Sequence, residues 1–174
     1  MPICLTHQLH WIMKKILLLA VMALVMISCS TSKQATVDPA QAEAIKALLE
    51  QQRYFVMVGS MRPLSAPTMS VSQGHKMIIR DGTVSCYLPY VGSGQNVSYG
   101  SSFKAMNFTA PVLDYKVEYP KADRARITFR VDNGDDHYRF HVEVFMNGKT
   151  TIDVEPRARD AVSYSGMLHG LEML

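Results

Sequence analysis

The chain has 174 residues, of which 48% are hydrophobic and 19% are charged, and its net charge is +3 at pH 7. This length suits a single domain with a modest core. No block of like charge interrupts the sequence, so it shows no electrostatic footprint for nucleic acid and we expect no nucleic-acid partner.

A charge-free apolar run lies near the N-terminus, at residues 16–28, directly after two lysines. A membrane span needs about 20 apolar residues, whereas the apolar part of a secretory signal has about 7–15. The run fits the second class. We therefore expect a signal peptide over residues 13–28, with translation starting at Met13 and residues 1–12 as a gene-model extension.

The signal ends in MISC, residues 26–29, which resembles the lipobox of bacterial lipoproteins with Met26 in place of the usual leucine. In a lipobox the cysteine is acylated and becomes the first residue, so we expect a membrane anchor at Cys29. Residues 29–37 are the lipidated tether, because they lack the apolar content to pack. The expected location is the envelope of a Gram-negative bacterium, as an outer-membrane lipoprotein that faces the periplasm. An ordinary secreted protein is the alternative.

Cysteine usage agrees with export. Cys4 falls in the expected gene-model extension and Cys29 carries the expected lipid. Cys86 is then the single cysteine of the folded part, so an internal disulfide is excluded there. Such a thiol is usually buried and inert, as a small hydrophobe. As a nucleophile, Cys86 lacks an identifiable histidine or asparagine partner in the sequence.

Residues 38–174 are expected to form one globular domain that begins with a helix. Asp38 has the side chain of an N-cap, and Pro39 stands at the first helical position, where its missing N–H is tolerated. Apolar residues then recur in one narrow stripe: Ala42, Ile45, Leu48 and Leu49. This pattern predicts a helix that covers the domain's own sheet.

From Tyr54 onward the hydrophobic pattern has the period of β-strands. Strands are predicted within residues 54–63, 75–90, 113–120, 125–131, 137–146, 151–155 and 161–168. Asp81-Gly82 divides the second segment, and this pair is suited to a type I′ hairpin turn. Closing or curling a sheet removes exposed edges. The predicted fold is therefore α+β and mainly β, with the N-terminal helix packed on a curved antiparallel sheet or partly closed barrel of about seven or eight strands.

Two short blocks support a family resemblance. They are YLPYVG at residues 87–92 and SYSG at residues 163–166, with Val91 where the family usually has an aromatic residue. Together with the lipobox, they make the chain resemble domain-of-unknown-function family 4251, exported lipoproteins of gut Bacteroidales. The resemblance covers residues 38–168 and implies a compact domain that faces the periplasm, with no assigned activity.

Residues 86–100 combine tyrosines with glycines and leave the strand through Pro89. Tyrosines on glycine-flanked loops suit recognition of a glycan, a peptide or a protein. The candidate binding residues are Tyr87, Tyr90, Gly92, Gly94 and Tyr99. In the alternative, the tyrosines pack in the core and the glycines serve turns; we expect this for Tyr87 and leave Tyr90 and Tyr99 open.

Other chemistry has weak support in the sequence. His137 and His141 are four residues apart, which on a strand separates them by about 13 Å, too far for one ion. We expect no metal and no cofactor. Three glutamates fall on separate predicted strands: Glu118, Glu143 and Glu155. A non-enzymatic domain that binds a ligand or partner is favoured, the alternative is a hydrolase that uses scattered carboxylates or Cys86, and the oligomeric state stays open.

Overall fold

The computed structural model describes residues 38–91 and 105–174. The elements are α2 (Pro39–Glu50), β1 (Arg53–Pro63), β2 (Met69–Ser70), β3 (Lys76–Arg80), β4 (Thr83–Leu88), β5 (Met106–Lys121), β6 (Arg124–Asp132), β7 (His137–Phe145), β8 (Lys149–Pro156), β9 (Val162–Gly170) and the short 3-10 helix η1 (Leu171–Met173). Neither helix in this part of the chain has the length and apolar character needed to cross a membrane.

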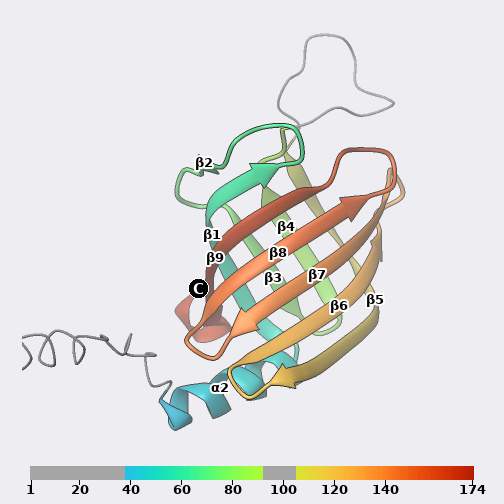
Figure 1. The fold of residues 1–174 in the computed structure, drawn as a ribbon. Coiled ribbons are helices and arrows are strands. Elements are labelled where there is room, and N and C mark those ends of the chain that lie inside the picture. Colours follow the sequence, from blue (N-terminus) through green and yellow to red (C-terminus); the bar gives the residue numbers. More distant parts are fainter. Residues whose placement is uncertain (1–37, 92–104) are drawn as a thin grey trace, which may run out of the picture. The chain divides into compact units, whose positions relative to one another are not determined.

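Eight of the nine described strands close into an antiparallel barrel (Figure 1). Neighbours from β3 to β9 pair in chain order, β1 pairs with β3, and β1 also pairs with β9. This last ladder runs from Tyr54 opposite Gly170 to Pro63 opposite Val162 and completes the circle. The additional strand β2 pairs with β1 beyond the residues that contact β3. The predicted α+β, mainly β architecture is confirmed, in the form of a closed barrel.

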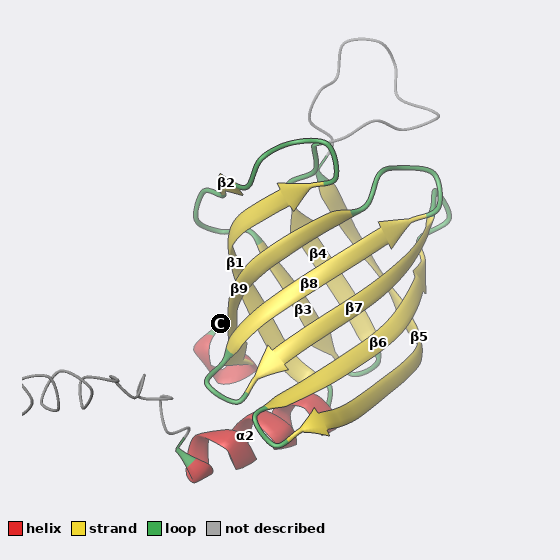
Figure 2. Ribbon diagram, viewed as in Figure 1, coloured by secondary structure: helices red, strands yellow, loops and turns green. Residues whose placement is uncertain are grey.

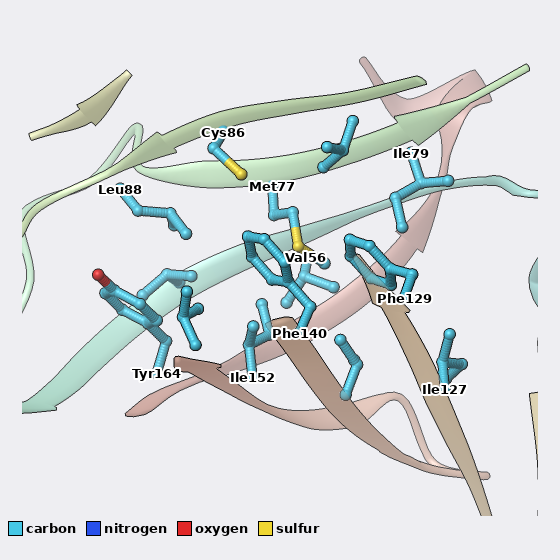
Figure 3. Packing of buried hydrophobic residues seen from close by; sticks show 14 of the residues in the cluster. Val56, Met77, Ile79, Cys86, Leu88, Ile127, Phe129, Phe140, Ile152 and Tyr164 are labelled. Atoms are coloured by element: carbon cyan, nitrogen blue, oxygen red, sulfur yellow. The ribbon is translucent and has the colours of Figure 1, made fainter. Parts of the chain in front are cut away.

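Alternating side chains fill the barrel. On β7, every second residue from Tyr138 to Val144 is buried, while the residues between them face outward. The rings of Phe129 and Phe140 stack near the middle of the interior, 4.7 Å apart and nearly parallel. Figure 3 shows these rings surrounded by aliphatic and sulfur-containing side chains from several strands. The interior is therefore a packed hydrophobic core.

Backbone geometry explains why glycine occurs in the β3–β4 turn and in β9. Asp81 and Gly82 have φ of 49° and 72°, as a type I′ turn requires, so the predicted hairpin between β3 and β4 is confirmed. At the β1–β9 seam, Gly166 lies against the backbone of β1. A Cβ there would come within 2.9 Å of the Met57 carbonyl carbon and closer still to its oxygen. The glycine of the SYSG block therefore permits the close approach that closes the barrel.

The two ends of the barrel differ (Figure 2). At the helix end, α2 and η1 lie beside the short β3–β4, β5–β6 and β7–β8 turns. At the opposite end, which we call the loop end, lie the β1–β3, β4–β5, β6–β7 and β8–β9 connections. One end of the barrel is therefore flanked by helices and short turns, and the other by connecting loops.

The helix end is closed mainly by apolar contact. The Asp38 side chain accepts a hydrogen bond from the Ala40 amide at 3.0 Å, which confirms the predicted N-cap. Ile45 and Leu49 are buried in the core, so the prediction that the helix packs on its own sheet is also correct. Tyr115 of β5 donates its hydroxyl to the Leu49 carbonyl at 2.9 Å, and burial raises the pKa of Tyr115 to about 12.

Candidate functional site

At the loop end, two tyrosine hydroxyls join segments that are far apart in the barrel. Tyr90, which follows β4 and is 3% exposed, donates to the carbonyl of Asp160 at 3.0 Å. Tyr164 of β9 donates to the carbonyl of Pro89 at 2.6 Å. Because β4 and β9 are not neighbouring strands, the YLPYVG and SYSG blocks contact each other across the barrel mouth.

A buried carboxylate holds two loop-end connections together. Asp136, between β6 and β7, is 6% exposed, and its Oδ1 accepts three backbone N–H groups. The donors, at 2.8 to 3.1 Å, are His137, Arg157 and Ala158. The other oxygen, Oδ2, lies 3.8 Å from Nε of Arg159, whose guanidinium lies 5.7 Å from the centre of the Tyr90 ring. Charge-assisted hydrogen bonds of this kind fix loop geometry.

A pocket of about 430 Å³ opens beside this cluster. Its polar and aromatic lining comes from β5, β7 and the two connections: Asn107, Phe108, Asn133, Asp135, Tyr138 and Arg159. The Phe108 and Tyr138 rings stack at 4.9 Å. Amides, a carboxylate and a guanidinium supply both donors and acceptors for hydroxyl groups. Tyr138 is only 3% exposed, so the pocket surface is mainly polar. We call this the loop-end pocket.

Tyr87 does not lie in the core, so that prediction was wrong. Its side chain is 48% exposed on the outer face of β4, where its ring stacks on His75 at 5.1 Å. Strand alternation explains the error: Cys86 and Leu88 point inward, which directs Tyr87 outward. Tyr87 and Tyr90 therefore occupy different surroundings and form no common surface.

The remaining candidate residues, Gly92, Gly94 and Tyr99, lie outside the described residues, as does the predicted lipidation site Cys29. The residues of the loop-end pocket were not singled out from the sequence. Asn107 and Arg159 are distant in the chain and line the same pocket because of the barrel's topology. Strand alternation placed Tyr138 on the inward face, but no local pattern marked the pocket.

The residues invoked for a hydrolase are not arranged for catalysis. Cys86 is 2% exposed, its thiol points into the core (Figure 3), and burial raises its pKa far above the ordinary value. A thiolate nucleophile is therefore disfavoured. The three glutamates lie on the outer wall, each in an ion pair: Glu118 with Lys116, Glu143 with Arg124, and Glu155 with Arg139.

One row on the outer wall does bring a hydroxyl, a carboxylate and an imidazole together. Ser163 of β9, Asp153 of β8 and His141 of β7 are direct neighbours in register, and the Ser163 hydroxyl donates to Asp153. The carboxylate lies between the other two groups, whereas a catalytic triad needs the imidazole in the middle. Within residues 38–91 and 105–174 there is also no cluster of three or more His, Cys, Asp or Glu that could hold a metal ion.

Comparisons with known proteins agree with this architecture. A crystal structure of a DUF4251 family protein from Bacteroides eggerthii has a TM-score of 0.64 and 14% sequence identity, over 81% of this chain and 95% of that chain. At this identity the likeness shows the fold. No curated protein matches the chain. The family model described as "Domain of unknown function (DUF4251)" matches residues 37–168. The resemblance seen in the two sequence blocks is thus confirmed, and the chain belongs to the DUF4251 family.

Proposed function

We propose that the protein is a non-catalytic binding module of the cell envelope, anchored by a lipid on Cys29, and that it binds a glycan in the loop-end pocket. The observation that carries this proposal is the lining of the pocket, to which Arg159, Asn107 and Asp135 contribute next to Phe108 and Tyr138. Sugars present hydroxyl groups along their edges, and these groups find hydrogen-bond donors and acceptors there.

The rest of the barrel supports this location. Side chains fill its interior (Figure 3), and α2 covers the helix end. The contacts of Asp136 and Tyr90 hold the described segments of the loop end together before any ligand arrives. Segments fixed in this way lose less conformational entropy on binding.

The predicted anchor is compatible with that arrangement. The lipobox supports acylation of Cys29, and the polar tether that follows joins the domain at Asp38, beside the helix end. The loop end is therefore at the opposite end of the barrel from Asp38.

A glycan array probed with the intact protein in detergent micelles tests the binding proposal. We expect the wild type to retain at least one class of oligosaccharide and Asn107→Ala to lose it, because Asn107 is exposed and lines the pocket. Gln41→Ala, an exposed amide on α2, is the matched control and should bind as the wild type does. An array without binding, or equal binding by Asn107→Ala, would contradict the proposal.

Mass spectrometry of the N-terminal peptide from the native host tests the anchor. We expect acylated Cys29 as the first residue, with residues 1–28 removed, as a lipobox implies. Detection of unmodified Cys29 within a longer chain would exclude the lipid anchor, while leaving the loop-end pocket untouched.

A further inference from the structure

A second concave surface lies on the outer wall of the barrel, across β5 to β8 near the loop end. This outer groove has a volume of about 490 Å³, within the usual range of small-ligand sites. Tyr138 is the one residue that lines both the outer groove and the loop-end pocket among the described residues. The groove is therefore a separate surface with its own side chains.

Strand register brings two arginines together in the groove. Arg130 of β6 lies directly opposite Arg139 of β7, between Leu113 of β5 and Glu155 of β8 in the same row. Like charges directly opposite each other destabilise a sheet. Arg157, which follows β8, lines the same groove and adds a third guanidinium. Three guanidinium groups and the carboxylates of Asp132 and Glu155 therefore line one groove.

A ligand carboxylate would compete with Glu155 for Arg139 and with Asp114 for Arg130. Arg139 and Glu155 are separated by 3.7 Å, and both side chains are more than half exposed. An exposed pair of this kind contributes little to stability and rearranges easily. Arg130 donates a hydrogen bond to the Asp114 carboxylate, and both of these side chains are also more than half exposed. Arg157 forms no ion pair within the described part of the chain.

An irregularity of β5 adds apolar surface to the same groove. Asp114 has a φ of 54°, and the β5–β6 register shifts between Leu113 and Lys116. The strand bulges there, as an interrupted ladder does. Leu113, which lines the groove, is left 46% exposed.

We infer that the outer groove binds a sugar acid, meaning a ligand with one carboxylate, several hydroxyl groups and an apolar ring face. Arg130 and Arg139 present paired donors that match a carboxylate. Asp132 and Glu155, also in the lining, accept hydrogen bonds from hydroxyl groups and repel a doubly charged phosphate ester. Leu113 contacts the ring. This assignment does not depend on the glycan proposed for the loop-end pocket.

Titration of the isotope-labelled intact protein with D-glucuronate, followed by amide chemical shifts, tests the inference. We expect shifts at Arg130, Arg139 and Arg157, weaker binding of glucose 6-phosphate, and no shifts there with D-glucose. Arg139→Gln should weaken glucuronate binding at least about tenfold. Arg126→Gln, an exposed arginine on β6 outside the groove, is the matched control and should bind normally.

Three results would overturn the inference: no glucuronate shifts in the groove, equal binding of glucose, or unchanged affinity in Arg139→Gln. Tighter binding of glucose 6-phosphate than of glucuronate would also overturn the single-carboxylate assignment. Asn107→Ala should leave glucuronate binding unchanged, so failure of the loop-end proposal and failure of this one are distinguishable.

Discussion

The two ends of the barrel are closed by different forces. At the helix end, Ile45 and Leu49 enter the hydrophobic core, and a hydrogen bond from Tyr115 supplements them. At the loop end, Tyr90 and Asp136 join the described segments through hydrogen bonds to backbone groups. Apolar contact is non-directional, whereas hydrogen bonds require defined geometry. The comparison indicates that apolar burial stabilises the helix end, while hydrogen bonds fix the positions of the backbone segments beside the loop-end pocket.

The largest expected effect on stability is at the β1–β9 pairing that closes the barrel. Gly166→Ala places a Cβ against the Met57 backbone, so we expect a loss of at least about 3 kcal/mol of unfolding free energy or failure to fold. Urea unfolding measures it. Gly59→Ala, in the bulged part of β1 where an added Cβ meets nothing within 4 Å, is the control and should change stability by less than about 1 kcal/mol. Equal effects would contradict the seam assignment.

The next largest effect is expected from shortening the buried side chain of Leu49 in α2. Leu49 is fully buried, so Leu49→Ala should lower the unfolding free energy by about 2–5 kcal/mol through lost contacts and the cavity left behind. Leu48→Ala, on the partly buried side of α2, is the comparison and should have a smaller effect. A loss below about 1 kcal/mol for Leu49→Ala would show that the helix does not close that end.

Alkaline pH should also act on the helix end. The folded pKa of Tyr115 is raised to about 12, so the unfolded chain releases the proton first as pH rises above its ordinary value near 10. This contribution is fully present below pH 10 and is lost between about pH 10 and pH 12, on the order of 2–3 kcal/mol. Denaturant titrations across this window measure it, and Tyr115→Phe should show a shallower decline. An equally steep loss of stability in Tyr115→Phe would show that Tyr115 is not the group responsible.

Gly82→Val tests the β3–β4 hairpin at the helix end. Gly82 has a φ of 72°, which a β-branched residue resists, so we expect a loss of about 1–3 kcal/mol. The midpoint of thermal unfolding measures it. An unchanged midpoint would mean that the turn adopts another conformation.

The smallest effect is expected from the loop-end hydroxyl. Tyr90→Phe removes the hydrogen bond to the Asp160 carbonyl and should cost about 0.5–1.5 kcal/mol. Tyr87→Phe, on the exposed outer wall, is the control and should be neutral within about 0.5 kcal/mol. Equal losses would contradict the distinction drawn between the two tyrosines.

Sequence patterns predicted those parts of the fold that depend on interactions between residues close in the chain. The N-cap at Asp38, the apolar stripe through Leu49 and the Asp81-Gly82 turn all depend on residues close in the chain. The alternation of β4 also indicates that Tyr87 faces outward, because its apolar neighbours Cys86 and Leu88 face inward. That signal was present in the sequence and was misread.

Long-range arrangement could not be predicted in this way. Arg130 faces Arg139 because of the β6–β7 register, and Asp136 meets Arg159 because two separate connections converge at one barrel end. Closure itself requires the β1–β9 pairing of the first and last long strands. These contacts depend on strand order, which a single sequence does not specify.

Amide chemical-shift mapping with maltotetraose, cellotetraose and chitotetraose tests the central claim most directly, because it reports on both barrel ends in one experiment. The account predicts that at least one of these oligosaccharides shifts Asn107 and Arg159 at the loop-end pocket and leaves Leu49 and Gly82 at the helix end unchanged. Shifts confined to the helix end, or no shifts at either end with any of the three, would contradict the assignment of the loop end as a glycan-binding surface.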